Sequence, residues 1–248
     1  MLYLLMIWAL SAAPPAADRV VPSSTRSTTV VERTTAALTD DLSRAGLRLG
    51  APVFLRLFKA EGRFEVWIEG EDGRFVRFRD HPICAFSGTL GPKEATGDHQ
   101  APEGAYFVPP RAMNPSSAFH LSFDLGYPNA FDRAHGRTGS FLMVHGGCVS
   151  VGCYALTDAV IEEVWTLMDA AFTGGQPYVR VHALPFRPTA ENLTAHRESR
   201  WSEFWRDLAA GWEMFQATRR PPDAAVKAGR YVFTDEGRTA ADRGSAAP

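Results

Sequence analysis

The alternation of apolar and polar residues predicts β-structure in the first half of the chain. Residues 64–69 alternate apolar and acidic side chains, which is the period of a half-buried strand. Asp72 and Gly73 then supply the positive φ of a tight hairpin turn, and an apolar segment returns over 74–78. Further segments with the length and composition of strands are 53–58, 83–86, 105–108, 119–124, 141–144 and 178–182.

Helical periodicity takes over after residue 158. Asp158 is a natural N-cap, apolar residues follow the helical repeat as far as Phe172, and Gly174 with Gly175 ends the pattern. A second helical stripe consists of Trp201, Phe204, Trp205, Leu208, Trp212 and Phe215. Side chains of this size bury large areas, so packing on the domain is favoured over a ligand-binding aromatic platform.

These elements predict a mainly β fold with α: a mixed sheet or sandwich, one helix packed against it, and a helical C-terminal extension. The expected organisation is a signal peptide (1–17), a flexible lead-in (18–48), a globular domain (49–188), the helical extension (189–220) and a poorly ordered tail (221–248). The lead-in is Ser/Thr-rich over its first half and has room for one short helix near its end. The tail has too few large apolar residues to fold securely.

The N-terminal segment indicates export. Apolar residues 2–10 followed by small residues 11–17 resemble a secretory signal with its cleavage region, and the run is too short to span a bilayer permanently. No Lys or Arg precedes it, so an uncleaved anchor and a buried N-terminal strand or helix stay open as alternatives. The net charge of −2 over 248 residues leaves no basic footprint and argues against a nucleic-acid partner.

The candidate chemistry lies in residues 140–158, where a strand, a Gly-rich turn and a helix follow one another. His145 ends the apolar run and Cys153 stands just before the helix. A free thiol is a poor nucleophile at neutral pH, and a neighbouring imidazole corrects this by accepting its proton. The glycines of the turn allow its backbone to approach a substrate and to direct amides at a developing oxyanion.

Three other interpretations of these residues stay open from the pattern. Cys153 could be a small buried hydrophobe, which is a common fate of a free cysteine. His145, Cys148, Cys153 and His182 could hold zinc, although their spacing matches no common structural zinc site. Cys148 and Cys153 could form a disulfide and leave Cys84 free.

The segment HGGCVSVGC over 145–153 resembles the signature of the L,D-transpeptidase catalytic family, which has the YkuD-like fold and a motif that reads HG…SHGC. It is closer to the YafK-like branch of that family, and four further segments are similar to that branch in the same order. These segments are 82–93, 97–104, 129–139 and 185–187. The resemblance spans about residues 50–218 and identifies 49–188 as an L,D-transpeptidase-like catalytic domain.

The resemblance implies a role for each matching residue. Cys153 is the nucleophile, and His145 is the general base and later the acid. Gly146 matches the position whose carbonyl orients the imidazole in the family. Ser150 and Gly152 match the serine and glycine of the motif, beside the amides that form the oxyanion site.

The chain departs from the family pattern at two positions. Val151 replaces the second histidine of SHGC, and Ala155 replaces the arginine that usually follows the cysteine by two. Tyr154, Arg133 and His135 are therefore candidates for substrate contacts.

What the resemblance implies is a periplasmic enzyme that acts through a thioester on peptidoglycan stem peptides, without a cofactor, a metal or an obligatory protein partner. The YafK-like branch is associated with hydrolysis that releases lipoprotein from diaminopimelate. Transpeptidation to an amine is the alternative within this class, and a non-catalytic wall-binding domain is the alternative from another class. The sequence leaves open whether water or an amine is the acceptor.

Overall fold

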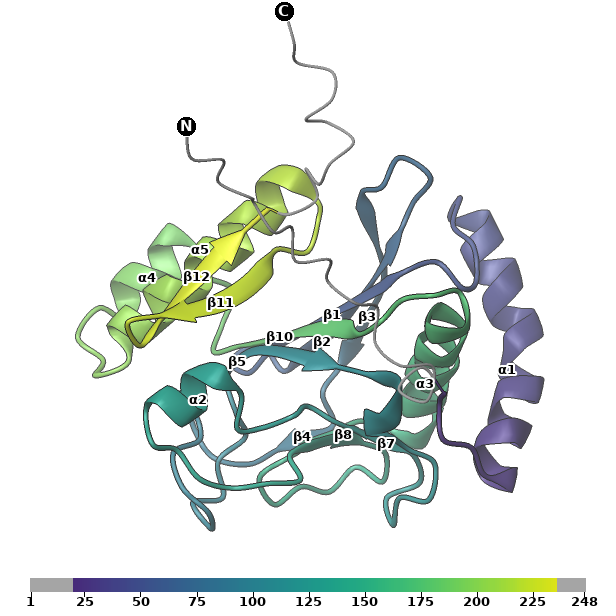
Figure 1. The fold of residues 1–248 in the computed structure, drawn as a ribbon, viewed down its shortest axis with the longest axis horizontal. Helices are drawn as coiled ribbons and strands as arrows, with labels where there is room; N and C mark the ends of the chain where they lie inside the picture. Colours follow the sequence, from purple (N-terminus) through teal and green to yellow (C-terminus); the bar gives the residue numbers. More distant parts are fainter. Residues whose placement is uncertain (1–19, 236–248) are drawn as a thin grey trace, which may run out of the picture.

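Two five-stranded sheets form the centre of the fold. Figure 1 shows how the helices and strands are arranged in space. The computed structural model describes residues 20–235, so the expected signal peptide lies outside the described residues. The first sheet has the order β3-β2-β1-β10-β5. Its strands are β1 (Val53–Phe58), β2 (Arg63–Glu69), β3 (Phe75–Pro82), β5 (Gly104–Val108) and β10 (Val179–Leu184). The predicted fold class, mainly β with α, is confirmed.

The first sheet is covered on both faces, which differs from the half-buried strand expected at 64–69. Strand β1 pairs with β10 in parallel and with β2 in antiparallel orientation. Glu65 is fully buried because the guanidinium of Arg56 donates two hydrogen bonds, at 3.0 and 2.6 Å, to one oxygen of its carboxylate. The acidic residue Glu65 in the alternating pattern of β2 therefore lies on a second packed face of the sheet and not on a face exposed to solvent.

The second sheet, of order β4-β9-β8-β7-β6, carries the central stretch. Its strands are β4 (Ala85–Phe86), β6 (Met113–Asn114), β7 (Ser122–Asp124), β8 (Met143–His145) and β9 (Tyr154–Ala155). Phe123, Val144 and Tyr154 are fully buried and belong to the large core cluster that also contains Leu55 and Val66 of the first sheet. The residues that alternate with them along each strand point to the opposite face.

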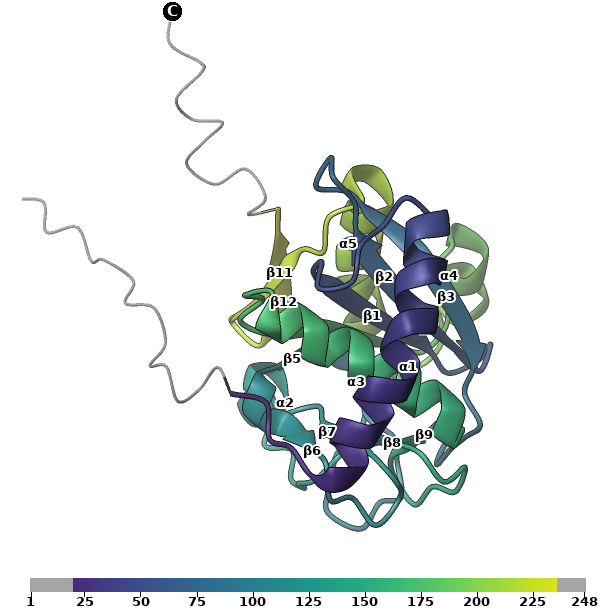
Figure 2. The ribbon, with the colours of Figure 1, turned by 90° about the vertical axis from the view of Figure 1, so that its right-hand side faces the viewer.

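The region expected to be a flexible lead-in with one short helix near its end instead contains a long helix, α1 (Thr25–Arg44). The flexible expectation is therefore wrong for these residues, and the expected short helix is part of α1. Helix α1 packs across α3 (Asp158–Thr173), as Figure 2 shows. Val30, Leu38 and Leu42 are its buried apolar residues. Their contact with α3 and the core stabilises a Thr-rich segment whose own helix propensity is low.

The C-terminal extension is helical as expected, with α4 (Ala190–Ala195) and α5 (Ser202–Thr218). The apolar stripe of α5 packs on the domain, since Phe204, Trp205, Leu208 and Phe215 are buried. The expected poorly ordered tail is wrong over 223–234, which forms the hairpin β11 (Asp223–Lys227) and β12 (Arg230–Thr234).

The hairpin is held by aromatic contacts to distant parts of the chain. Tyr231 stacks on Phe131 of the short helix α2 (Ala130–Ala134), with ring centroids 4.4 Å apart. Phe233 covers Gly211 of α5, where a Cβ atom would come within 2.6 Å of the ring.

Between residues 20 and 235, no helix is both long and apolar enough to cross a membrane.

Candidate active site

Neighbouring strands place His145 and Cys153 on one face of the second sheet. Strands β8 and β9 are parallel, with Val144 opposite Tyr154 and His145 opposite Ala155. Cys153 directly precedes Tyr154, whose side chain points into the core, so the thiol lies on the other face with the imidazole. The pairing of β8 with β9 therefore brings together His145, at the end of β8, and Cys153, just before β9.

The imidazole of His145 is held in one tautomer. Its Nδ1 lies 2.6 Å from the carbonyl oxygen of Gly146, and a carbonyl only accepts hydrogen bonds, so Nδ1 carries the proton. The ring is 3% exposed and lies against Phe119, with centroids 4.8 Å apart. Burial lowers the pKa of His145 below its ordinary 6.5, although the bond to Gly146 opposes the shift. Nε2 is left as the basic nitrogen.

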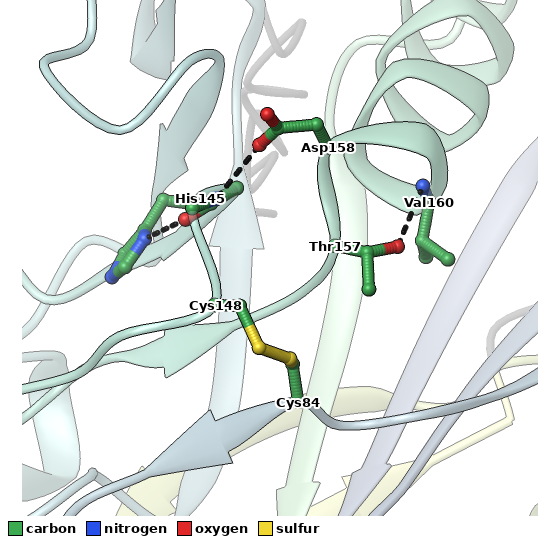
Figure 3. The surroundings of a disulfide bond; sticks show 8 residues. Cys84, His145, Cys148, Thr157, Asp158 and Val160 are labelled. Atoms are coloured by element: carbon green, nitrogen blue, oxygen red, sulfur yellow. Dashed lines mark hydrogen bonds between the residues drawn. A yellow bond between two sulfur atoms is a disulfide. The ribbon is translucent and has the colours of Figure 1, made fainter.

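Gly146 fits its position because no side chain can be accommodated there. A Cβ atom would lie 2.6 Å from Oδ1 of Asp158 and 3.1 Å from the carbonyl oxygen of Phe119. The same Asp158 oxygen accepts a 2.8 Å hydrogen bond from the N–H of Gly147, as Figure 3 shows. The start of α3 therefore fixes the turn that follows His145.

The expected N-cap of α3 is one residue off. Thr157 is the N-cap, and its hydroxyl accepts from the N–H of Val160 at 3.3 Å. Asp158 is the first residue of the helix, and its carboxylate is turned to Gly147 instead. Adjacent Thr and Asp are both good N-caps, so the local sequence alone does not choose between them.

Cys153 is the free cysteine of the described chain and is partly exposed. Its Sγ lies 3.4 Å from the N–H of Met143 and 3.8 Å from the carbonyl oxygen of Phe141. Burial raises the pKa of the thiol above its ordinary 9.0, and the Met143 N–H opposes the shift. No hydrogen bond joins Sγ to His145 among residues 20–235. Because burial disfavours the charged form of each group, the resting pair at neutral pH is a neutral thiol and a neutral imidazole.

Ser150 closes the loop on Cys153 with two hydrogen bonds. Its Oγ donates to the carbonyl oxygen of Cys153 at 2.7 Å and accepts from the N–H of Cys153 at 3.0 Å. Ser87 in turn donates to the carbonyl oxygen of Ser150 at 2.9 Å. The motif serine is thus a positioning residue that acts through the backbone of the nucleophile.

Ser150→Ala is expected to slow thioester formation about tenfold, because a shift of the thiol by a fraction of an ångström raises the barrier by about 1.4 kcal/mol. Loss of the two bonds should lower the free energy of unfolding by about 1 kcal/mol. The rate of mass increase with a carbapenem measures the first effect. Ser150→Thr keeps the hydroxyl and should restore the rate, and equal rates in all three proteins would contradict the positioning role.

The remaining two cysteines, Cys84 and Cys148, form a disulfide with Cα atoms 5.3 Å apart (Figure 3). The alternative of a Cys148–Cys153 disulfide is therefore wrong. The zinc alternative fails as well, because Cys148 has no thiolate to offer and His182 lies in β10 of the other sheet. Across the described residues, no group of three or more His, Cys, Asp or Glu could hold a metal ion.

The disulfide ties the turn between His145 and Cys153 to the strand β4, across 64 residues of sequence. Removing it in the double variant Cys84→Ser/Cys148→Ser should lower the free energy of unfolding by about 2–4 kcal/mol, since the unfolded chain regains the loop entropy. Denaturant titration measures the loss. Reductant should destabilise the wild type by a similar amount and leave the double variant unchanged, and a wild type indifferent to reductant would contradict this account.

The backbone amides around Cys153 differ in whether they are already hydrogen-bonded. The N–H of Cys153 is occupied by Ser150 Oγ, whereas the N–H groups of Val151 and Gly152 make no hydrogen bond within residues 20–235. Gly152 has a φ of +99°, which turns the backbone ahead of the thiol. The free amides that can receive a negative oxygen therefore precede Cys153.

The prediction that the side chain of Tyr154 contacts the substrate is wrong. It is fully buried and its hydroxyl donates to the carbonyl oxygen of Pro102 at 2.7 Å. Alternation along β9 forces this result, because neighbours in a strand point to opposite faces. Placing Cys153 in the site sends Tyr154 into the core.

Arg133 and His135 lie on and just after α2, beside the C-terminal hairpin. The guanidinium of Arg133 donates to the carbonyl oxygen of Pro128, and the ring of His135 stacks on Phe131. Within residues 20–235, no hydrogen bond or ring contact joins either of them to Cys153 or His145. Their role in substrate binding stays a prediction.

Three residues of the site were missed in the sequence. Phe119 covers His145, and Asp158 anchors Gly147. Asp124 stands directly opposite Met143, which contacts the thiol. The alternation of β7 could have placed Asp124 on the face of His145, but its pairing partner is visible only in the fold.

The chain is 41% identical over 187 residues to "Putative L,D-transpeptidase YafK" of Escherichia coli strain K12. The match covers 75% of this chain and 75% of that relative. A protein of the same name from Escherichia coli O157:H7 matches with the same identity and coverage. No established protein-family model matches the chain.

Among solved structures, the chain is similar to the helical cell shape determining protein Pgp2 from Campylobacter jejuni, with 20% identity and a TM-score of 0.44. That match covers 72% of this chain and 64% of the other. Bd1075 of Bdellovibrio bacteriovorus matches with 19% identity and a TM-score of 0.42, over 66% of this chain and 58% of the other. The chain spans less than two thirds of both structures.

Proposed function

Because the chain belongs to the L,D-transpeptidase family, in its YafK-like branch, we propose that it is a cysteine enzyme that cleaves an amide at the diaminopimelate of peptidoglycan stem peptides. The observation that carries this proposal is the shared face of Cys153 and His145, with Nε2 of the imidazole free to accept the thiol proton. A lipoprotein attached to diaminopimelate is the proposed leaving group. The action is proposed to be periplasmic, after export by the segment 1–17.

In the first step, Nε2 of His145 takes the proton of Cys153 as the sulfur attacks the amide carbonyl carbon. A carbon–sulfur bond forms, and the carbonyl oxygen gains negative charge beside the free N–H groups of Val151 and Gly152. The carbon–nitrogen bond then breaks. The amine leaves with the proton returned from the imidazolium, and a thioester remains on Cys153.

In the second step, His145 removes a proton from water, and the hydroxide oxygen attacks the thioester carbonyl carbon. The carbon–sulfur bond breaks, and the product is a carboxylic acid that releases its remaining proton to solvent and leaves as a carboxylate. The imidazolium returns its proton to the sulfur, which restores the neutral pair. If an amine takes the place of water, the same steps form a new amide, and the enzyme is a transpeptidase.

Digestion of sacculi separates hydrolysis from transpeptidation. Lipoprotein-bearing and bare sacculi are incubated with the protein, and the muropeptides are then analysed by mass. Hydrolysis predicts free lipoprotein and unmodified stems from the first substrate and no new crosslinks in the second. New crosslinked dimers or amine adducts would overturn the hydrolase proposal in favour of transpeptidation.

The alternative from another class, a wall-binding domain without activity, predicts that Cys153 forms no acyl adduct. A carbapenem is a suitable probe because its strained amide acylates such thiols without a stem peptide. An unmodified mass after incubation of the reduced, folded protein would favour the binding domain.

Substrate contacts by Arg133 and His135 are proposed only on their position in or beside loops near the motif. Arg133→Ala tests the first of them on the same sacculi. Unchanged release of lipoprotein by the variant would show that Arg133 does not bind the substrate. Its guanidinium is already hydrogen-bonded to the carbonyl oxygen of Pro128.

A further inference from the structure

Asp124 lies in one row with the residues that surround the thiol. It is directly opposite Met143 in the antiparallel pair of β7 and β8, and directly opposite residues in a sheet share a face. The N–H of Met143 contacts Sγ of Cys153. Ser122, two residues earlier, stands opposite His145 in the same way. A carboxylate therefore lies on the face that carries the thiol and the base.

The carboxylate of Asp124 has one hydrogen bond and no ion pair within the described part of the chain. The N–H of Gly126 donates to its Oδ1 at 2.8 Å. Burial raises the pKa of Asp124, and the Gly126 N–H opposes that shift. A half-buried carboxylate with spare acceptor sites gains most from a cationic partner.

The position of Asp124 is open to a ligand. Asp124, Phe141 and Met143 line one groove of about 630 Å³, and the last two also contact Cys153 Sγ. The groove therefore runs beside the backbone that contacts the nucleophile, although Cys153 itself is not among its lining residues. Its walls combine the apolar Phe107, Pro109 and Met113 with the polar Arg111 and Asn114. No ion pair joins Arg111 to Asp124 within residues 20–235, and Asp124 is half-buried, so a charge bound at its carboxylate is partly shielded from water.

We propose that Asp124 binds an ammonium group of the acyl donor, namely the second amino group of the diamino acid whose carbonyl is attacked. This inference rests on the proposed function. In a stem peptide one amino group of diaminopimelate is part of the peptide chain, and the second is cationic unless it is crosslinked. Asp124 thus selects stems whose second amino group is free, and it excludes those in which acylation has removed the charge.

Two synthetic stem peptides test the selection. They carry the same cleavable amide and differ in the second amino group, which is free in one and acetylated in the other. The wild type is expected to have a kcat/KM about 10- to 100-fold higher for the free amine, which is the range of a charge-assisted hydrogen bond in a shielded site. Asp124→Asn should lose that factor on the free amine, so that its kcat/KM values for the two peptides become similar.

Asp169→Asn is the matched control, because Asp169 is another partly buried carboxyl with a pKa raised by burial but lies on α3 away from the groove. It should keep the wild-type preference. Equal turnover of both peptides by the wild type would overturn the proposal, even if Asp124→Asn did not fold. An equal loss on both peptides in Asp124→Asn would also overturn it. Turnover of neither peptide by the wild type would instead overturn the proposed function, and the inference with it.

Discussion

Cys153→Ala is expected to eliminate both thioester formation with a carbapenem and release of lipoprotein from sacculi, a loss of at least about a thousandfold. The proposed reaction has no route around the carbon–sulfur bond, because without the Cys153 thiol only water remains to attack the amide carbonyl carbon. The site should otherwise persist, since Cys153 is positioned by its own backbone bonds to Ser150. Intact-mass analysis and muropeptide analysis measure the two losses.

The double variant Cys84→Ser/Cys148→Ser is the control for this experiment. It removes two sulfur atoms but keeps the thiol of Cys153, so the carbapenem adduct should still form on the folded fraction. An adduct on Cys153→Ala, or its absence from the double variant under conditions where that variant is folded, would contradict Cys153 as the nucleophile.

His145→Gln is expected to reduce kcat/KM by about 10²- to 10⁴-fold, which is the usual contribution of a general base. The size of the loss follows from the resting state of the pair. Burial raises the pKa of the Cys153 thiol above 9.0, so little thiolate exists at neutral pH unless a base removes the proton as the bond forms. Glutamine fills the space of the imidazole and can keep the bond to Gly146, but it accepts no proton.

The pH dependence of acylation should change in the same variant. In the wild type the imidazole pKa lies below 6.5, so Nε2 stays unprotonated and the rate should fall only as pH drops below that value. In His145→Gln the rate should follow the thiol instead and keep rising with pH beyond 9.0. The rate of carbapenem acylation from pH 5 to 10 measures both limbs.

His99→Gln is the matched control, because His99 is exposed in a loop and has no contact with the site within residues 20–235. It should show the wild-type profile. A wild-type pH profile in His145→Gln would show that His145 is not the general base and that the Cys153 thiol loses its proton without it.

Local patterns predicted most strands correctly, and β1 was predicted to the residue over 53–58. The long helix α3 and the stripe of α5 were equally visible, because their repeats extend over several turns. The first half of helix α1 was missed because its apolar residues are few and separated by threonines. The hairpin 223–234 was missed because its aromatic residues pack on distant partners: Tyr231 stacks on Phe131, about 100 residues away, and Phe233 covers Gly211, about 20 residues away.

The nucleophile, the base and the backbone between them follow from the sequence, because His145, Gly146 and Cys153 stand within nine residues of one another and their chemistry is local. The disulfide partner of Cys148, the anchoring of Gly147 by Asp158 and the place of Asp124 beside the thiol depend on the fold. Each of these joins segments whose register is set by strand pairing and helix packing across the core. No periodicity along the chain encodes such a pairing, since alternation gives the face of a residue and not its neighbour.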